Sequence, residues 1–475
     1  MSKNTSQDIE QGYLAITNAT INQLFKFFDD HIQLENLKLV VRSLQNISYQ
    51  ECTTVVSQGL LKLINIQKLL LLIESFCRIN SDGLVRLMDS VQKLNTLTDL
   101  TIYLGRKNDI GCQGASIIGQ SLKNLSNLNY FNLYIGSQNQ IQAKGMAELG
   151  EGLRCLQNLT ILQIDIQSQN EISEKGALEF GKGIKNLQKL QQFYLCIGSQ
   201  NDLNPEGTKG ICEPIQELSN LVTLQLKIEW KNNICSQGAI SIGKGISGLS
   251  SNLLNLNLSL GSHNNIGELG AQGIGLGLKH LKQLQHLCLT IEASNQIGKI
   301  GAIGLGEGLR FLINLQNLNL IICQYNNIQP EGAISIGNSI QYLVNLKSIY
   351  LSIESHNNIS SQGLVSIGNS LKTLNNVLKL TLVFGEENKI GNEGAKILGE
   401  GISYLEKLTQ LSISIDQNDI SEQGVMDLLN WRKKLSHLKV LTLNIEDQEF
   451  YLNGIFSYLK SCLKKCKRLV LFKQF

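Results

Sequence analysis

The feature that most constrains this chain is an Asn-x-Ile/Leu element that recurs about every 31 residues. The intervals between its eleven copies are 31 or 32 residues, except for a last interval of 30. The copies begin at Asn108, Asn139, Asn170, Asn201, Asn232, Asn264, Asn295, Asn326, Asn357, Asn388 and Asn418. Degenerate copies at Cys77 and Gln45 extend the series towards the N-terminus. A fixed period of this length is typical of a chain built from stacked structural repeats.

Each repeat combines a strand pattern with a helix pattern. The segment L-x-x-L-x-L-x-I ends in alternating apolar residues, which predicts a strand with one buried face. The following segment, for example residues 114–125, has apolar residues three and four apart, as a helix face requires. Fifteen strand patterns start at Leu34, Ile66, Leu97, Leu128, Leu159, Leu190, Leu221, Leu253, Leu284, Leu315, Leu346, Val377, Leu408, Leu438 and, weakly, Cys466.

These motifs resemble the leucine-rich repeat, specifically its ribonuclease inhibitor-like class, over residues 34–471. The resemblance implies an α/β horseshoe solenoid of about 15 repeats, with parallel strands on the concave face and helices on the convex face. In the familiar pattern the Asn follows the last strand leucine by three residues. Here about three more residues intervene, as in the segment from Ile135 to Asn139, so we expect a longer strand or a bulged loop.

The repeated polar and small residues have structural explanations. A side-chain amide has two donor hydrogens and an acceptor oxygen, so we expect the repeat Asn residues to pair backbone groups of the turn and to form a ladder. Glycine stands six residues after each ladder position, as at Gly114 and Gly145, which predicts a positive φ or a close backbone approach. A second glycine five residues later, as at Gly119, predicts close packing of the helix against the sheet.

The predicted domain organisation is one continuous solenoid with a cap at each end. Residues 1–33 form an N-terminal helical cap, in which 21–32 is an amphipathic helix, residues 34–459 form the solenoid, and residues 460–475 form a basic C-terminal cap. The chain has no secretory signal pattern and no stretch apolar enough to cross a membrane. Its eleven cysteines are scattered, which favours an intracellular, reducing compartment, the cytoplasm ahead of the nucleus.

The composition and motifs favour neither catalysis nor a cofactor. Lys and Arg number 42 against 39 Asp and Glu, and this balance gives no case for nucleic-acid or membrane binding. The segment 238–245 imitates a phosphate-binding loop but lacks its final Ser/Thr and falls in a repeat helix. Cys462 and Cys466 lack the further ligands of a zinc site, and His263 and His356 lie three repeats apart. We therefore expect no catalytic, cofactor-binding or metal-binding residues.

The outward strand positions point to a protein partner. Side chains between the strand leucines are largely neutral, and aromatic side chains are interspersed on strands and adjoining loops at Tyr103, Tyr130, Tyr134, Tyr194, Trp230, Tyr325 and Tyr350. Tyr and Trp commonly anchor protein interfaces. Their preference for strands explains the same residues without binding, so both interpretations stand. The loops after the strands are basic early, at Arg106 and Lys107, and acidic later, as at Glu292 and Glu354.

The sequence therefore predicts a non-catalytic scaffold that binds another protein through its concave face and strand-end loops. Two alternatives come from resemblance. Ran GTPase-activating proteins have a similar repeat horseshoe and present an arginine from an early strand-end loop, where this chain has Arg106. An arginine there can stabilise the charge of phosphoryl transfer. Against this, the acidic tail of that family is absent. The other alternative is an inhibitor that wraps around an enzyme, as ribonuclease inhibitor does.

Overall fold

The computed structural model describes residues 12–16, 21–42, 48–435, 437–446 and 468–472. The chain separates into two compact units, Met1–Asn233 (unit 1) and Ile234–Phe475 (unit 2), where the sequence predicts one continuous solenoid domain. Repeats in a stack contact only their neighbours. A long stack therefore lacks the shared core that would bind its parts into a single compact body.

Unit 1 alternates strands and helices from its first described residues. Its elements are β1 (Tyr13–Ile16), α1 (Ile21–Asp30), β2 (Asn36–Val41), α2 (Tyr49–Leu60), β3 (Lys68–Ile73), α3 (Asn80–Val91), β4 (Asp99–Leu104), α4 (Gly111–Leu122), β5 (Tyr130–Ile135), α5 (Gln142–Leu153), β6 (Ile161–Ile166), α6 (Ser173–Ile184), β7 (Gln192–Ile197), α7 (Asn204–Ile215) and β8 (Thr223–Ile228).

Unit 2 continues the same alternation. Its elements are α8 (Cys235–Ser247), β9 (Asn255–Leu260), α9 (Gly267–Leu278), β10 (His286–Ile291), α10 (Gly298–Leu309), β11 (Asn317–Ile322), α11 (Gln329–Ile340), β12 (Ser348–Ile353), α12 (Ser360–Leu371), β13 (Lys379–Phe384), α13 (Gly391–Ile402), β14 (Gln410–Asp416), α14 (Glu422–Leu428), the 3-10 helix η2 (Leu429–Lys433), β15 (Val440–Glu446) and β16 (Arg468–Phe472).

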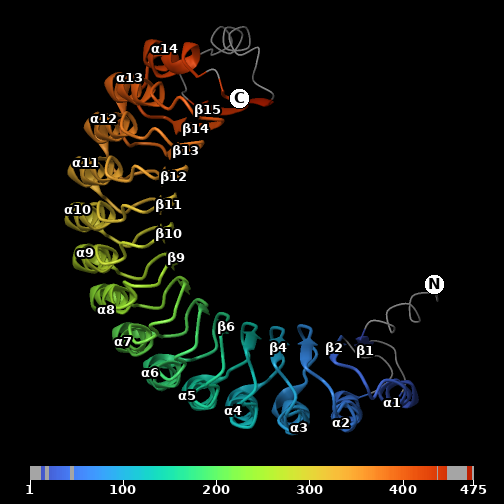
Figure 1. Ribbon diagram of the computed structural model, residues 1–475. Helices are drawn as coiled ribbons and strands as arrows, with labels where there is room; N and C mark the ends of the chain where they lie inside the picture. Colours follow the sequence, from blue (N-terminus) through green and yellow to red (C-terminus); the bar gives the residue numbers. More distant parts are fainter. Residues whose placement is uncertain (1–11, 17–20, 43–47, 436, 447–467, 473–475) are drawn as a thin grey trace. The chain divides into compact units, whose positions relative to one another are not determined.

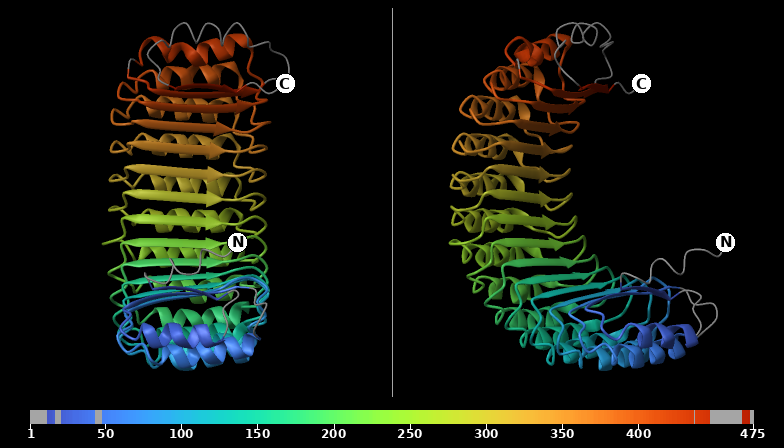
Figure 2. Two further views of the ribbon diagram at one scale, coloured as in Figure 1. Left: turned by 90° about the vertical axis from the view of Figure 1, so that its right-hand side faces the viewer. Right: turned by 45° about the vertical axis from the view of Figure 1, so that its right-hand side comes forward.

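The strands of each unit form a parallel sheet in chain order, and the helices cover one face of it (Figure 1). Each of the fifteen predicted strands begins two residues after its predicted start, from Asn36 to Arg468. Within each unit the arrowheads point to the same edge of the sheet (Figure 2). The chain is therefore an α/β repeat solenoid, as predicted.

The ends of the chain differ partly from the prediction. Helix α1 occupies the predicted cap and buries Leu24, Phe27 and Phe28. The same segment also contributes β1, which pairs in parallel with β2, so 1–33 is not purely helical. At the other end β16 pairs with β15. The predicted cap helix before it, including Cys462 and Cys466, lies outside the described residues.

The core lies between each sheet and its helices. In β5 the pattern alternates between half-buried Tyr130, Asn132 and Tyr134 and buried Phe131, Leu133 and Ile135. The buried strand residues meet apolar helix residues such as Ile118 in α4, and both groups are almost fully inaccessible. The side chains that alternate with them point away from the helices. This second side is called the sheet face below.

The repeat Asn side chains form a hydrogen-bonded ladder within each unit. In unit 1 the backbone N–H of Asn139 donates to Oδ1 of Asn170 at 3.0 Å. Nδ2 of Asn170 donates to the carbonyls of Gly136 at 3.0 Å and Gln167 at 2.9 Å. The Gly136 carbonyl also accepts from Asn139. The ladder side chains are almost fully buried, so they pair backbone groups that water does not reach.

A second row of Asn residues, not predicted from the sequence, lies in the turn from helix to strand. Nδ2 of Asn127 donates to the Asn95 carbonyl at 2.8 Å, one repeat earlier. The same bond recurs at Asn158, Asn220, Asn314, Asn345 and Asn376. The signal was present, because Asn precedes the first strand leucine by one or two residues in most repeats. Each end of a repeat is thus tied to its neighbour by side-chain amides.

The recurrent glycines serve close packing, so of the two explanations predicted for the first set, close approach is confirmed and positive φ is wrong. Gly145 has no positive φ, and a Cβ there would meet Cβ of Ala115 at 2.6 Å. The second set lies between neighbouring helices, whereas the sequence predicts that it packs against the sheet. A Cβ on Gly150 would meet Cα of Phe180 in α6 at 2.6 Å. Helices this close need a residue without a side chain.

Positive φ instead occurs at three alternate residues of the strand-to-helix loop. After β5 these are Gln138, Gln140 and Gln142, with φ of 61°, 54° and 59°. This conformation allows backbone hydrogen bonds to the next repeat. The N–H of Gln138 donates to the Ser168 carbonyl, and that of Gln142 donates to the Asn170 carbonyl. These side chains give no local signal for this conformation. Only the third position shows one, because Gly111, Gly267, Gly298 and Gly391 occupy it in other repeats.

We expect Gln142→Gly to raise the free energy of unfolding by up to about 1 kcal/mol. A left-handed conformation costs a non-glycine residue about 1–2 kcal/mol, and greater chain entropy of glycine in the unfolded state offsets part of the gain. Chemical denaturation measures the change. The matched control is Lys144→Gly, two residues on and exposed in α5, which should lower stability by about 1 kcal/mol. Equal losses in both variants would contradict the assigned strain.

Candidate interaction surface

Three outward positions of each strand build rows across the sheet face. In unit 1 the register aligns Thr101, Asn132, Gln163, Tyr194 and Gln225 in the middle row. The row nearest the strand ends aligns Tyr103, Tyr134, Asp165, Cys196 and Lys227. We call this second set the strand-end row. It brings charged and aromatic side chains together at the strand ends of unit 1.

The aromatic part of the strand-end row is a stacked pair. The rings of Tyr103 and Tyr134 have centroids 4.2 Å apart and planes inclined by 3°. The distance between the ring centroids is close to the spacing of adjacent strands, so the flat face of each ring is turned towards the neighbouring strand. Burial and neighbouring Tyr103 raise the pKa of the Tyr134 hydroxyl, which hydrogen bonds to Tyr103. The stack presents a rigid aromatic edge on the sheet face.

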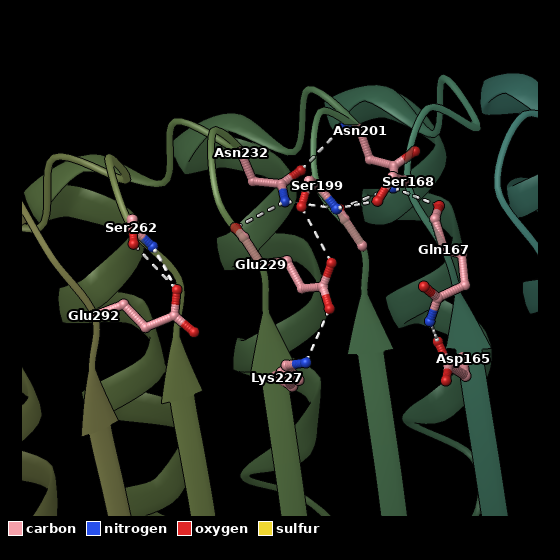
Figure 3. Close-up of polar contacts among 11 residues, drawn as sticks. Asp165, Gln167, Ser168, Ser199, Asn201, Lys227, Glu229, Asn232, Ser262 and Glu292 are labelled. Atoms are coloured by element: carbon pink, nitrogen blue, oxygen red, sulfur yellow. Dashed lines mark hydrogen bonds and ion pairs between the residues drawn. The ribbon is translucent and has the colours of Figure 1, made fainter. Parts of the chain in front are cut away.

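The charged part of the row surrounds Asp165. Nε2 of Gln167 donates to Asp165 Oδ1 at 2.6 Å (Figure 3). Burial is the main cause that raises the pKa of the Asp165 carboxyl, and the hydrogen bonds from Gln167 and Cys196 lower it in part. Burial, with Asp165 beside it, raises the pKa of the Cys196 thiol to about 12. Cys196 is therefore a protonated thiol at neutral pH rather than a nucleophile.

One strand further on, Lys227 and Glu229 form a part-buried ion pair. Nζ of Lys227 lies 2.9 Å from Glu229 Oε1, and Ser199 Oγ donates to Glu229 Oε2 at 3.1 Å (Figure 3). Asp165, Lys227 and Glu229 are not among the residues predicted from the sequence. The signal for Asp165 and Lys227 was a charge at a strand-end position where other repeats have neutral residues, whereas Glu229 has acidic counterparts at Glu74, Glu292 and Glu354. The proximity of Asp165, Lys227 and Glu229 to one another follows only from the register.

The remaining candidate aromatics lie at separate places. Tyr130 lines a groove on the sheet face with Lys68 and Asp99, and Tyr194 donates to Gln192 at 3.1 Å. Trp230, 41% exposed, lies in the loop after β8, with Lys231 Nζ 4.6 Å from its ring centroid. In unit 2, Tyr350 is an outward residue of β12.

Arg106, the candidate arginine finger, lies in the loop after β4. Its guanidinium carbon is 5.0 Å from the ring centroid of Phe76, which is itself 56% exposed. Its backbone N–H donates to Ser75 Oγ at 3.1 Å. The side chain is exposed at the edge of unit 1 and stacks on an aromatic ring, a contact that holds an arginine without an ion pair.

Unit 2 has its own polar cluster at the strand ends. The backbone N–H and the hydroxyl of Ser262 donate to Glu292 Oε2 at 3.0 and 3.2 Å (Figure 3). Burial, with Glu354 and Glu292 nearby, raises the pKa of the Cys323 thiol to about 12. Tyr325 lies two residues after Cys323 in the loop that follows β11, and it is 55% exposed.

The Tyr325 ring stacks on His356 with centroids 4.6 Å apart, and His356 Nδ1 lies 2.9 Å from Glu387 Oε2. These residues hold equivalent places in consecutive loops. The cluster joins one aromatic, one imidazole and one carboxylate side chain at the surface of unit 2.

The described residues contain no three His, Cys, Asp or Glu side chains placed to hold a metal ion. Likewise, none of the described helices is long and apolar enough to cross a membrane. The ladder residues, from Asn108 to Asn418, are buried in the loops rather than displayed on the sheet face. The candidate surface therefore consists of the outward strand rows and the loops at the strand ends.

Comparison with known proteins adds little to this geometry. No protein-family model matches the sequence, and no curated protein matches it. Among solved structures, a chain in the crystal structure of the Rad7 and Elc1 complex in yeast is similar, with a TM-score of 0.39 and 14% identity. The match covers 89% of this chain and 88% of that chain. A similarity of this degree carries no argument about function.

Proposed function

We propose that this chain is a non-catalytic leucine-rich repeat protein of the ribonuclease inhibitor-like class, which binds another protein through the sheet face and the strand-end loops. One observation supports this most. Parallel sheets are ordinarily covered on both faces, whereas no described helix covers the sheet face of either unit. This face carries largely neutral and aromatic side chains with few charges, a composition that favours a protein interface over a nucleic-acid surface.

The class assignment is supported by the repeat itself. The Leu pattern, the Asn ladder and the full helix in each repeat are the features by which the sequence resembles that class. The scattered thiols favour the cytoplasm as the compartment in which this chain works.

The proposal predicts that bulky charges on the sheet face will abolish capture of the partner. Asn132→Arg and Thr381→Arg each place an arginine on an outward strand position of one unit. Their matched controls are Gln120→Arg and Asn369→Arg on exposed helix positions. Affinity purification with quantitative mass spectrometry should find proteins that the wild type and both controls retain and that at least one sheet-face variant loses.

Once that partner is purified, Tyr194→Ala and Tyr350→Ala should each weaken its binding by more than about 1 kcal/mol if the tyrosines are anchors. Partner loss in the helix-face variants alone would show that the partner docks on the helices. Acceleration of GTP hydrolysis by a small GTPase, abolished by Arg106→Ala, would instead establish an enzyme-activating role.

A further inference from the structure

The side chains of the strand-end row of unit 1 differ in length from strand to strand. Tyr103 and Tyr134 are long and stand as a stacked pair, Asp165 and Cys196 are short, and Lys227 is long again. Adjacent strands are about 4.8 Å apart, so the two short residues set Tyr134 and Lys227 about 14 Å apart along the row. Asp165 and Cys196 lie between these two longer side chains. We call the part of the row from Tyr134 to Lys227 the Tyr134–Asp165 niche.

Asp165 is the carboxylate of the niche, and its hydrogen-bond donors are neutral. It accepts hydrogen bonds from Gln167 and Cys196, and no ion pair joins it to a Lys, Arg or His among the described residues. Lys227, the nearest cation along the row, is paired with Glu229 at 2.9 Å, and its attraction for Asp165 is opposed by the repulsion from Glu229. A half-buried carboxylate in this setting regains little counter-charge for the hydration it loses. It therefore favours any cation that can enter the niche.

The Tyr134 ring borders the niche and presents an aromatic face to it. The Tyr103 and Tyr134 rings are nearly parallel and stack from one strand to the next. The second face of the Tyr134 ring is therefore directed towards the strand that carries Asp165. An aromatic face attracts a cation placed over it, and arginine does this more often than lysine because its flat guanidinium stacks. The same guanidinium can direct N–H groups down to a carboxylate.

We propose that the Tyr134–Asp165 niche receives one arginine side chain of the partner protein, with the guanidinium against the Tyr134 ring and its N–H groups on the Asp165 carboxylate. This inference rests on the proposed function and specifies the chemistry of the partner at one place on the sheet face. The raised pKa of Asp165 agrees with it, because burial that disfavours the free carboxylate also strengthens its attraction for a cation.

The test uses full-length protein and the probe N-acetyl-arginine-methylamide, with the uncharged isostere N-acetyl-citrulline-methylamide as the matched probe. Ring signals of isotope-labelled tyrosine, assigned with Tyr134→Leu, report binding by NMR titration. The arginine probe should shift the Tyr103 and Tyr134 signals and bind about tenfold more tightly than the citrulline probe. Asp165→Asn should remove that preference.

Two controls separate the niche from general attraction to a sheet carboxylate. Asp99→Asn removes a carboxylate on the same face that lies 3.7 Å from Lys68, and it should leave the arginine preference unchanged. In the wild type, affinity for the arginine probe should rise as pH rises through the raised pKa of Asp165, since deprotonation creates the charge. The other groups facing Asp165 are Tyr134 on β5, Cys196 on β7, Lys227 on β8 and Glu229 in the loop after β8. Asp165→Asn tests their contribution directly, because the pH dependence should disappear.

Equal binding of both probes, no shift of the Tyr134 signal, or an unchanged preference in Asp165→Asn would each overturn the inference. These failures differ from failure of the proposed function. If Asn132→Arg abolishes partner capture while Asp165→Asn leaves it intact, the sheet face binds the partner without an arginine in the niche.

Discussion

We expect Asn170→Leu to lower the free energy of unfolding by about 3 kcal/mol. The substitution leaves the buried N–H of Asn139 without its acceptor, at a cost of about 1–3 kcal/mol. It also removes one of the two amide donors to each of the Gly136 and Gln167 carbonyls, which costs roughly 1 kcal/mol for each bond. Leucine has the same number and branching of side-chain heavy atoms as asparagine, and any crowding by its bulkier methyl groups adds to the loss from missing hydrogen bonds. Urea denaturation followed by circular dichroism measures the change.

Asn108→Leu provides a matched control at the start of the ladder. Asn108 donates to the Glu74 and Gly105 carbonyls, but its Oδ1 accepts no hydrogen bond from the described residues. The preceding ladder position is held by Cys77, which is itself buried. This variant should therefore lose only the donor bonds, about 1–2 kcal/mol. If Asn108→Leu and Asn170→Leu are equally destabilised, the acceptor role of the ladder oxygen is wrong.

The sequence predicts those parts of the fold in which the type of residue and the repeat period indicate the same structure. Apolar residues alternate along a strand and recur three and four residues apart along a helix. The buried and outward sides of β5 therefore follow from its sequence alone. The Asn ladder follows because only a side-chain amide both donates twice and accepts at the same buried place. The strand starts were displaced by two residues because the first leucine of the pattern packs in the turn before the strand.

The parts that the sequence does not predict depend on the neighbouring repeat. Positive φ at Gln138 and Gln140 has no local signature. At Gln138 the conformation directs the backbone N–H to the Ser168 carbonyl in the loop of the next repeat. Asp165 is recognisable as a charge on a neutral row, but its burial results from residues of the strands on both sides. The division into two units coincides with only a one-residue change in the sequence pattern, because the interval from Asn232 to Asn264 is 32 residues where the intervals on either side are 31.

We expect Gly275→Ala to lower the free energy of unfolding by about 3 kcal/mol, although alanine is intrinsically better in a helix by about 1 kcal/mol. Gly275 lies in α9 of unit 2. A Cβ there would lie 2.5 Å from the Gly304 carbonyl carbon and 2.9 Å from the Leu305 nitrogen of α10. Both are backbone atoms, so no side-chain rotation relieves the overlap and the two helices must separate. The midpoint of chemical denaturation measures the loss.

Gly248→Ala separates this packing effect from the general effect of adding a methyl group. Gly248 caps α8 with φ of −68°, a conformation open to any residue, and it is exposed. Its replacement should leave stability unchanged or raise it slightly. Gly308 makes the reciprocal contact, since a Cβ there would lie 2.8 Å from Cα of Gly275. If close helix packing explains the glycines, Gly308→Ala should resemble Gly275→Ala, and the double variant should lose less than the sum, because helices already separated by one methyl group accommodate the second. Additive losses would instead indicate that each glycine is required independently by its own backbone.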